Sequence, residues 1–245
     1  MIKRAILPSF FTITNIFLGF LALTYIFDGR YMAAAWLVVF ATICDYLDGK
    51  VARASKSQSL FGKELDSLAD AVSFGVVPAY LVYVTNFNTV GIWGVVLCFA
   101  YVFAGVFRLA RYNVQTASTK SRVFKGLPIP VAALSVVTYM IMSNYYWETM
   151  SMPRVLMFIV PGVSVLMVST IPYESLPSVL LRRGIRKNVM LLYYAAGLVF
   201  TIINPQKWMF PWVSGYIFLY LFRGIMRKLR QSKKEIELFD ERTPI

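Results

Sequence analysis

Four aspartates lie within residues 45–70 and follow a helical spacing. Asp45 and Asp48 are three residues apart, and Asp66 and Asp70 are four apart. On α-helices these spacings put each pair on one face. A hairpin of two such helices would bring the four carboxylates together, although repulsion and desolvation both oppose that. Because two divalent cations with oxygen ligands would neutralise them, and two metals can clamp a phosphoryl group, the spacing predicts a two-metal phosphoryl-transfer site.

Small and phosphate-binding residues stand between the two pairs. Gly49, Ala52 and Gly62 lack large side chains and would let a ligand approach the backbone closely. Arg53 can bind a phosphate through two parallel hydrogen bonds, and Ser59 offers a hydroxyl in the connecting loop. A loop whose acids only balance neighbouring lysines and arginines would not require so regular a pattern.

The elements that must position these residues are membrane-spanning helices. The chain has 245 residues, is 58% hydrophobic and has a mean hydropathy of +0.61. Its apolar stretches are continuous, which is typical of spanning helices and unlike the alternation of barrel strands. We therefore predict an all-α polytopic membrane protein with about eight transmembrane helices, or seven if one of the short or proline-containing segments does not cross. The predicted spans are 11–27, 31–49, 67–86, 91–110, 128–147, 153–171, 189–204 and 208–225.

The distribution of lysine and arginine predicts the orientation. With the N-terminus in the cytoplasm, only Arg30, Arg154 and Lys207 of the 25 Lys and Arg residues face outward. We expect an integral protein of the cytoplasmic (inner) membrane whose aspartate segment faces the cytoplasm. Its predicted parts are an interfacial segment over residues 1–10, a transmembrane catalytic domain over 11–225 and a cytoplasmic basic tail over 226–245.

Composition excludes several chemistries. The sequence contains no histidine, which removes Ser-His and Cys-His nucleophile arrangements. Cys44 and Cys98 stand far apart in apolar runs and are interpreted as buried apolar residues. The net charge of +13 favours the anionic membrane surface and anionic lipid or nucleotide groups as partners, and not nucleic acid.

The aspartate pattern resembles the signature of a known family. The spacing D-x2-D-G-x2-A-R-x8-G-x3-D-x3-D matches that of the CDP-alcohol phosphotransferases without a departure. The resemblance implies a six-helix core over most of residues 1–205, a homodimer, and transfer of a phosphatidyl group from a CDP-linked lipid to an alcohol with release of CMP. It implies two bound Mg²⁺ or Mn²⁺ ions held by Asp45, Asp48, Asp66 and Asp70, with Asp70 also acting as the general base. The residues it implies for the CDP moiety are Asp48, Gly49, Ala52, Arg53, Ser59 and Gly62.

Three further segments bear on the acceptor alcohol. Thr12 and Asn15 open the first span in a pattern similar to that of phosphatidylserine synthases, with Ser9 where that family has asparagine, and we assign both to the CDP site. The segments RLARYN (residues 108–113) and FKGLPIP (residues 124–130) resemble the integral-membrane type of the same synthases. We therefore expect CDP-diacylglycerol as donor and L-serine as acceptor. The predicted pocket for the serine carboxylate or the lipid phosphate contains Arg108, Arg111, Asn113 and Lys125.

Two alternatives remain open at this stage. Within the same reaction class, the acceptor could be glycerol 3-phosphate or an inositol phosphate, which would call for more arginines in the pocket. In a different class, the chain could transport divalent cations, because acidic residues inside membranes mark ion paths. That reading expects acids near mid-bilayer on several helices, whereas here they cluster at one boundary.

Overall fold

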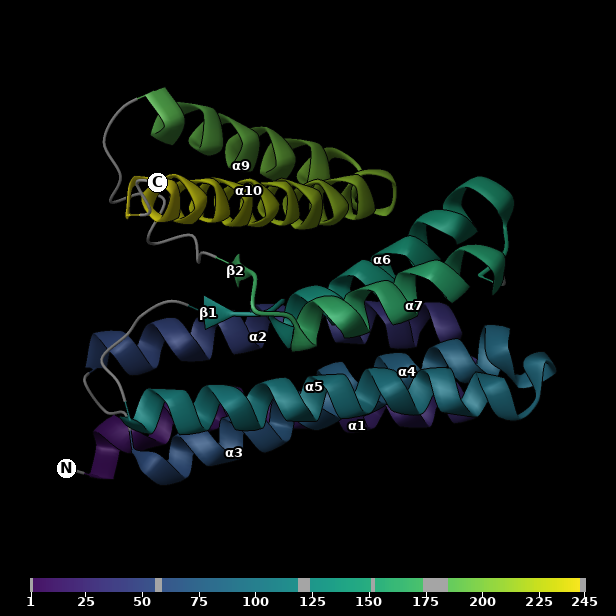
Figure 1. Cartoon of the computed structure of the whole chain (residues 1–245). Coiled ribbons are helices and arrows are strands. Elements are labelled where there is room, and N and C mark those ends of the chain that lie inside the picture. Colours follow the sequence, from purple (N-terminus) through teal and green to yellow (C-terminus); the bar gives the residue numbers. More distant parts are fainter. Residues whose placement is uncertain (1, 56–58, 119–123, 151–152, 174–184, 243–245) are drawn as a thin grey trace.

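The protein is a bundle of long helices that run roughly along one direction (Figure 1). The computed structural model describes residues 2–55, 59–118, 124–150, 153–173 and 185–242. Two-residue strands β1 (Phe124–Lys125) and β2 (Pro172–Tyr173) pair antiparallel and are the only strands in the described residues. The α-helices are α1 (Ile2–Phe27), α2 (Tyr31–Ser55), α3 (Leu60–Asp70), α4 (Val77–Val82), α5 (Ile92–Ser118), α6 (Ile129–Trp147), α7 (Pro153–Val168), α9 (Ile185–Ile203) and α10 (Pro205–Arg242).

All-α architecture is confirmed, and each of the eight predicted spans falls on a helix. Five helical stretches are long and apolar enough to cross a membrane: Phe10–Phe27, Tyr31–Val51, Leu60–Val90, Ile92–Gln115 and Pro205–Met226. The apolar helices Pro153–Val168 and Leu192–Ile203 are shorter, and α6, which carries the predicted span 128–147, is not among the five, so the total of eight crossings stays a prediction.

The predicted connection over residues 50–66 is shorter than expected. Helix α2 continues to Ser55, and α3 already begins at Leu60. The reason is local: Ser59 caps α3 by accepting a hydrogen bond from the Gly62 N–H (2.9 Å), so helix starts as soon as a cap is available. Residues 2–10 likewise continue into the first span as the start of α1, and 226–242 continue α10.

The helical stretch from Leu60 to Val90 is irregular where it passes through the bundle. It contains two π-helices, η1 (Ala71–Val76) and η2 (Tyr83–Phe87), and a 3₁₀ turn, η3 (Asn88–Val90). Pro78 has no N–H to donate to the carbonyl of Phe74, four residues earlier. The hydroxyl of Tyr101 donates to that carbonyl instead (2.9 Å), which satisfies it inside the core.

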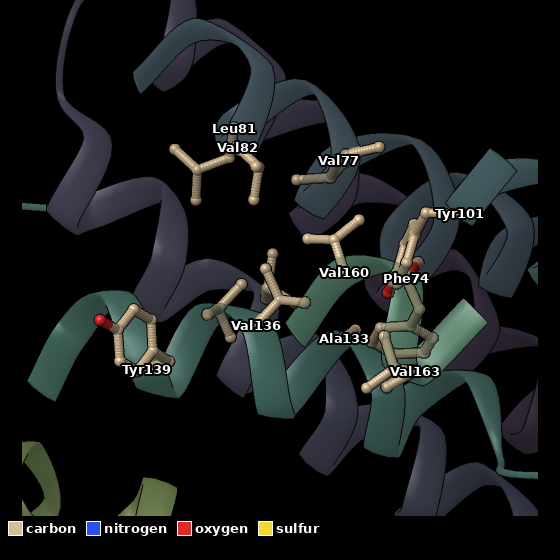
Figure 2. Close-up of a cluster of buried hydrophobic side chains, with 14 of the residues drawn as sticks. Phe74, Val77, Leu81, Val82, Tyr101, Ala133, Val136, Tyr139, Val160 and Val163 are labelled. Carbon is tan, nitrogen blue, oxygen red and sulfur yellow. Dashed lines mark hydrogen bonds between the residues drawn. The ribbon is translucent and has the colours of Figure 1, made fainter. Parts of the chain in front are cut away.

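The hydrophobic core lies where η1, α4, α5, α6 and α7 meet (Figure 2). Phe74 and Leu81 from the irregular stretch are fully buried there, with Val136 of α6 and Val160 of α7 beside them. These side chains hold together the part of the bundle that continues directly from Asp70.

The segment before α6 is hydrogen-bonded to the C-terminal end of α7 and the residues after it. Gly126 has a positive φ of 87° and its N–H donates to the carbonyl of Ile171 (2.9 Å), while the Leu127 N–H donates to Leu166 (3.0 Å). The β1–β2 pair extends this contact, with Phe124 opposite Tyr173. The FKGLPIP segment therefore serves as the junction between α5, α6 and α7.

The C-terminal hairpin α9–α10 lies on the outside of α6 (Figure 1). The rings of Tyr139 (α6) and Phe210 (α10) meet edge to face at 5.2 Å between centroids. Glycines permit close packing within the hairpin: a Cβ on Gly197 would lie 2.2 Å from the Trp212 ring. The hairpin is thus a layer added to the bundle.

We predict that Gly126→Ala strongly destabilises the protein. A Cβ there would lie 2.3 Å from the Met167 carbonyl oxygen, in a backbone conformation that L-residues avoid. Gly29→Ala is the matched control, because Gly29 also has a positive φ (74°) but no atom within 4 Å of the added Cβ. Thermal unfolding in detergent should show a loss of about 1 kcal/mol for Gly29→Ala and clearly more for Gly126→Ala. Equal losses of unfolding free energy in the two variants would mean that the close contact with the Met167 carbonyl does not affect stability.

Candidate functional site

Three carboxylates from two helices converge at one end of the bundle. Oxygens of Asp45 (α2), Asp66 and Asp70 (α3) all lie within 4.8 Å of one another. Asp48 is one turn beyond Asp45, is buried, and lies close enough to Asp66 for their charges to interact. Three of the four predicted aspartates therefore form one cluster, with Asp48 next to it.

Helix α1 supplies polar partners for the buried carboxylates. The hydroxyl of Thr12 donates to Oδ2 of Asp48, and Nδ2 of Asn15 donates to Oδ1 of Asp70 (3.1 Å). Thr12 and Asn15 are themselves buried, so these contacts lie inside the bundle. The two predicted residues of the first span thus hold the orientation of two aspartates.

A third contact brings α1 against the π-helix that follows Asp70. The hydroxyl of Ser73 donates to the carbonyl of Asn15 (3.0 Å), and a Cβ on Gly19 would lie only 2.4 Å from that hydroxyl. Thr12, Asn15 and Gly19 are spaced three and four residues apart and form one stripe along α1. The stripe sets how closely α1 approaches the acidic helices.

Buried oxygens at the site fit divalent cations. Oδ1 of Asp48, Oδ1 of Asp66 and Oδ1 of Asn15 are buried, and no donor from the described residues reaches them. Buried acceptors without donors are costly, and carboxylate and amide oxygens are the preferred ligands of Mg²⁺ and similar hard cations. The donor set is all oxygen and carries excess negative charge, which matches such an ion.

Arginine and lysine side chains border the acids on the side of α5. Arg108 is buried, and its charge interacts with those of Asp70 and Asp45. Its guanidinium lies 5.7 Å from the Tyr112 ring centroid, and Nζ of Lys63 lies 5.2 Å from the same ring. Arg108 makes no hydrogen bond to another described residue, so its five N–H groups are available to an anion.

The other members of the predicted acceptor pocket make different contacts. Arg111 donates to the carbonyls of Met167 (3.2 Å), Val168 (2.7 Å) and Ser169 (3.0 Å). Its positive charge stabilises the C-terminal end of α7, where the helix carbonyls carry partial negative charge. Asn113 donates to side chains on α3, to Oε2 of Glu64 (3.2 Å) and Oγ of Ser67 (3.0 Å); the side chain of Lys125 lies outside the described residues. Among the four residues of the predicted acceptor pocket, Arg108 is the one whose described contacts place it next to the aspartates.

The remaining predicted CDP-binding residues lie at the end of α2 and the start of α3. Gly49 lies on α2 directly after Asp48, and Gly62 lies in the first turn of α3. A Cβ on Gly62 would lie 3.1 Å from the Ser59 hydroxyl that caps this helix, so the small residue keeps the cap intact. Ala52 and Arg53 are on the last turn of α2, and their side chains lie outside the described residues.

Sequence reasoning missed several residues that shape the site. Gly19 continues the spacing of Thr12 and Asn15, and that regular spacing was the available signal. Ser73 and Tyr112 had no such signal, because their roles depend on which helix packs against them.

This chain is similar to proteins of a known family of phosphatidyltransferases. Residues 5–171 match the CDP-alcohol phosphatidyltransferase family, a range that includes all four aspartates and Arg108 and ends before the α9–α10 hairpin. A CDP-diacylglycerol–serine O-phosphatidyltransferase of Helicobacter pylori is 34% identical over 223 residues, covering 91% of this chain and 90% of the relative. An archaetidylserine synthase of Methanothermobacter thermautotrophicus is 38% identical over 174 residues, covering 68% and 69%. A CDP-diacylglycerol–serine O-phosphatidyltransferase of Mycobacterium tuberculosis is 39% identical over 188 residues, covering 73% and 64%.

We predict that Gly19→Ala weakens cation binding by moving α1 away from the aspartates. Mn²⁺ titration of the purified protein should show an affinity loss of about tenfold. The double variant Gly19→Ala/Ser73→Gly should recover part of that loss, because it removes the hydroxyl that the new methyl group meets. Gly162→Ala, whose Cβ meets no atom within 4 Å, is the control. Should Gly19→Ala bind Mn²⁺ as tightly as this control, the positioning role of the α1 stripe is wrong.

Proposed function

Because the chain belongs to the CDP-alcohol phosphatidyltransferase family, we propose that it transfers the phosphatidyl group of CDP-diacylglycerol to the hydroxyl of L-serine. The products are phosphatidylserine and CMP. The observation that carries this proposal is the cluster of Asp45, Asp66 and Asp70 oxygens beside the buried Arg108. The names of the relatives support serine as the acceptor.

The four aspartates would hold two divalent cations, Mg²⁺ or Mn²⁺. Bound there, the cations would neutralise the pyrophosphate of the donor and stabilise the phosphate that leaves with CMP. The unsatisfied oxygens of Asp48 and Asp66 support this assignment, as do the hydrogen bonds from Thr12 and Asn15 that orient the carboxylates. The residues that would bind the CDP moiety lie at the end of α2 and the start of α3: Gly49, Ala52, Arg53, Ser59 and Gly62.

Asp70 is the proposed general base. Asn15 donates to its Oδ1, and no described residue donates to Oδ2, which is left to accept the proton of the serine hydroxyl. As that proton leaves, the serine oxygen forms a bond to the phosphatidyl phosphorus, and the bond from phosphorus to the CMP oxygen breaks. No covalent enzyme intermediate is needed, which agrees with a sequence that lacks histidine.

Arg108 is the proposed partner of the serine carboxylate. It is buried next to the general base, so an acceptor bound to it would have its hydroxyl near Asp70. A phosphorylated acceptor would favour several arginines, whereas Arg111 is held by the carbonyls at the end of α7. In this proposal Arg111 and Asn113 position α5, and Lys125 lies on β1 next to the same junction.

The setting of the reaction follows from charge and hydropathy. The several long apolar helices and the family both indicate an integral membrane protein. We place it in the cytoplasmic (inner) membrane with the aspartates facing the cytoplasm, because lysine and arginine concentrate at that end of the predicted topology. There a water-soluble acceptor can meet a lipid pyrophosphate. The family resemblance implies that it is a homodimer. Family membership also favours this enzyme over a divalent-cation transporter.

The proposal is tested by CMP release from CDP-diacylglycerol with L-serine, glycerol 3-phosphate or inositol phosphate as acceptor. We expect release with serine alone, and none after chelation of divalent cations. Asp70→Asn should lower kcat by about 10²- to 10⁴-fold, because the base is lost. Asp28→Asn, at the other end of α1, is the control and should keep full activity. Full activity of Asp70→Asn, or release with another acceptor but not with serine, would overturn the proposal.

Arg108→Gln should raise the KM for serine by about 10- to 100-fold, because a buried charge-assisted hydrogen bond is lost. Slow turnover of ethanolamine, which has the amine and hydroxyl of serine but no carboxylate, should be unchanged in this variant. Arg111→Gln is the matched control: it should lower the unfolding temperature more than it changes the serine KM. If Arg108→Gln impairs the reaction with serine and the reaction with ethanolamine equally, the arginine does not recognise the carboxylate.

A further inference from the structure

An open cavity lies at the opposite end of the bundle from the aspartates. It has a volume of about 630 Å³, which is within the usual size range of ligand sites. Its walls are the turn between α1 and α2, the π-helix η2, the end of α6 and the turn after it. Helix α2 begins at this cavity, and Asp45 follows Tyr31 by fourteen residues, which is about 21 Å along a helix. The two sites are therefore separate.

The cavity carries one positive and one negative side chain that do not pair with each other. Arg30 and Glu148 both line it, and in the described part of the chain they form no ion pair. The guanidinium of Arg30 instead lies over the Tyr25 ring, 4.2 Å from its centroid. Thr85 and Asn144 add neutral polar groups to the lining. This combination suits a ligand that itself carries both charges.

Hydrogen bonds hold the walls of the cavity in place. Asn86 is buried, and its Nδ2 donates to the Thr85 hydroxyl (2.7 Å) and to the Met150 carbonyl (3.2 Å), which ties η2 to the turn after α6. Ser143 donates to the Thr149 carbonyl (2.7 Å). Glu148 adopts a left-handed conformation (φ 53°), which is uncommon for a residue other than glycine, asparagine or aspartate. The cavity is therefore built into the fold.

Aromatic residues next to the cavity indicate its depth in the membrane. Tyr145, Tyr146 and Trp147 directly precede Glu148 and are all exposed. Tyrosine and tryptophan are enriched where a membrane protein meets the lipid headgroups, so these exposed rings at the end of α6 indicate that level. Phe27, at the end of α1, is 86% exposed and offers an apolar surface near the same turn. A lipid headgroup is the zwitterion that is abundant at that level of a membrane protein.

We propose that this cavity binds the headgroup of a zwitterionic, ammonium-bearing phospholipid in the leaflet opposite the aspartate site. The lipid phosphate would bind Arg30, and the ammonium group would bind Glu148. The site is independent of the transferase chemistry, because none of its lining residues belongs to the catalytic cluster.

The test is lipid retention by the full-length protein, measured by native mass spectrometry in detergent. The two probes are phosphatidylethanolamine and phosphatidylglycerol with the same acyl chains. We expect preferential retention of phosphatidylethanolamine. Arg30→Gln and Glu148→Gln should each reduce that retention about fivefold, since each removes one charge contact of an exposed side chain. Arg154→Gln and Asp28→Asn remove matching charges from residues that do not line the cavity and should change nothing.

Equal retention of both lipids, or equal losses in the control variants, would show general surface attraction and overturn the proposal. Displacement of the lipid by soluble phosphoethanolamine at the same concentration would assign the cavity to a water-soluble zwitterion and contradict the membrane assignment. CMP release in detergent should stay unchanged in Arg30→Gln and Glu148→Gln. That measurement keeps failure of the lipid site distinguishable from failure of the transferase proposal.

Discussion

Carboxylates at the end of apolar helices must be oriented and compensated, and much of this structure serves that need. Burial in a membrane protein makes each charge costly unless it finds donors or a cation. Helix α1 meets part of the demand through Thr12 and Asn15, and Arg108 of α5 brings a positive charge to the same place. The remaining unsatisfied oxygens are those that a cation would use. These oxygens and the excess of negative charge fit a divalent cation.

The partners from the long helices α1 and α5 meet an irregular stretch of backbone that follows Asp70. The π-helix η1 begins directly after Asp70, and π-helical turns occur frequently at functional sites. It presents Ser73 to α1, while its Phe74 carbonyl is satisfied by Tyr101 of α5. A regular helix through Pro78 would leave that carbonyl without a donor in the core. The irregular backbone that follows Asp70 therefore contacts both α1 and α5.

Two arginines one turn apart on α5, Arg108 and Arg111, make different contacts. Arg108 turns toward the aspartates, whereas Arg111 binds the carbonyls that end α7. Because both lie on one helix, the junction of α5, α6 and α7 fixes where Arg108 stands. Gly126 makes this junction possible, since any side chain there would meet the Met167 carbonyl. The segments 108–113 and 124–130 are thus both parts of the packing contact between α5, α6 and α7.

The sequence alone determined the helical class, the approximate position of each helix, and the grouping of Asp45, Asp48, Asp66 and Asp70. It could do so because periodic spacing and continuous hydrophobicity are local properties, and a short hairpin leaves two adjacent helices few ways to pair. Only the tertiary structure separated Arg108 from Arg111, and only it identified Gly19, Ser73 and the cavity between Arg30 and Glu148. Those features depend on contacts between residues far apart in the chain. Spacing within one helix carries no information on which neighbour a side chain will meet, and packing of the whole bundle decides it.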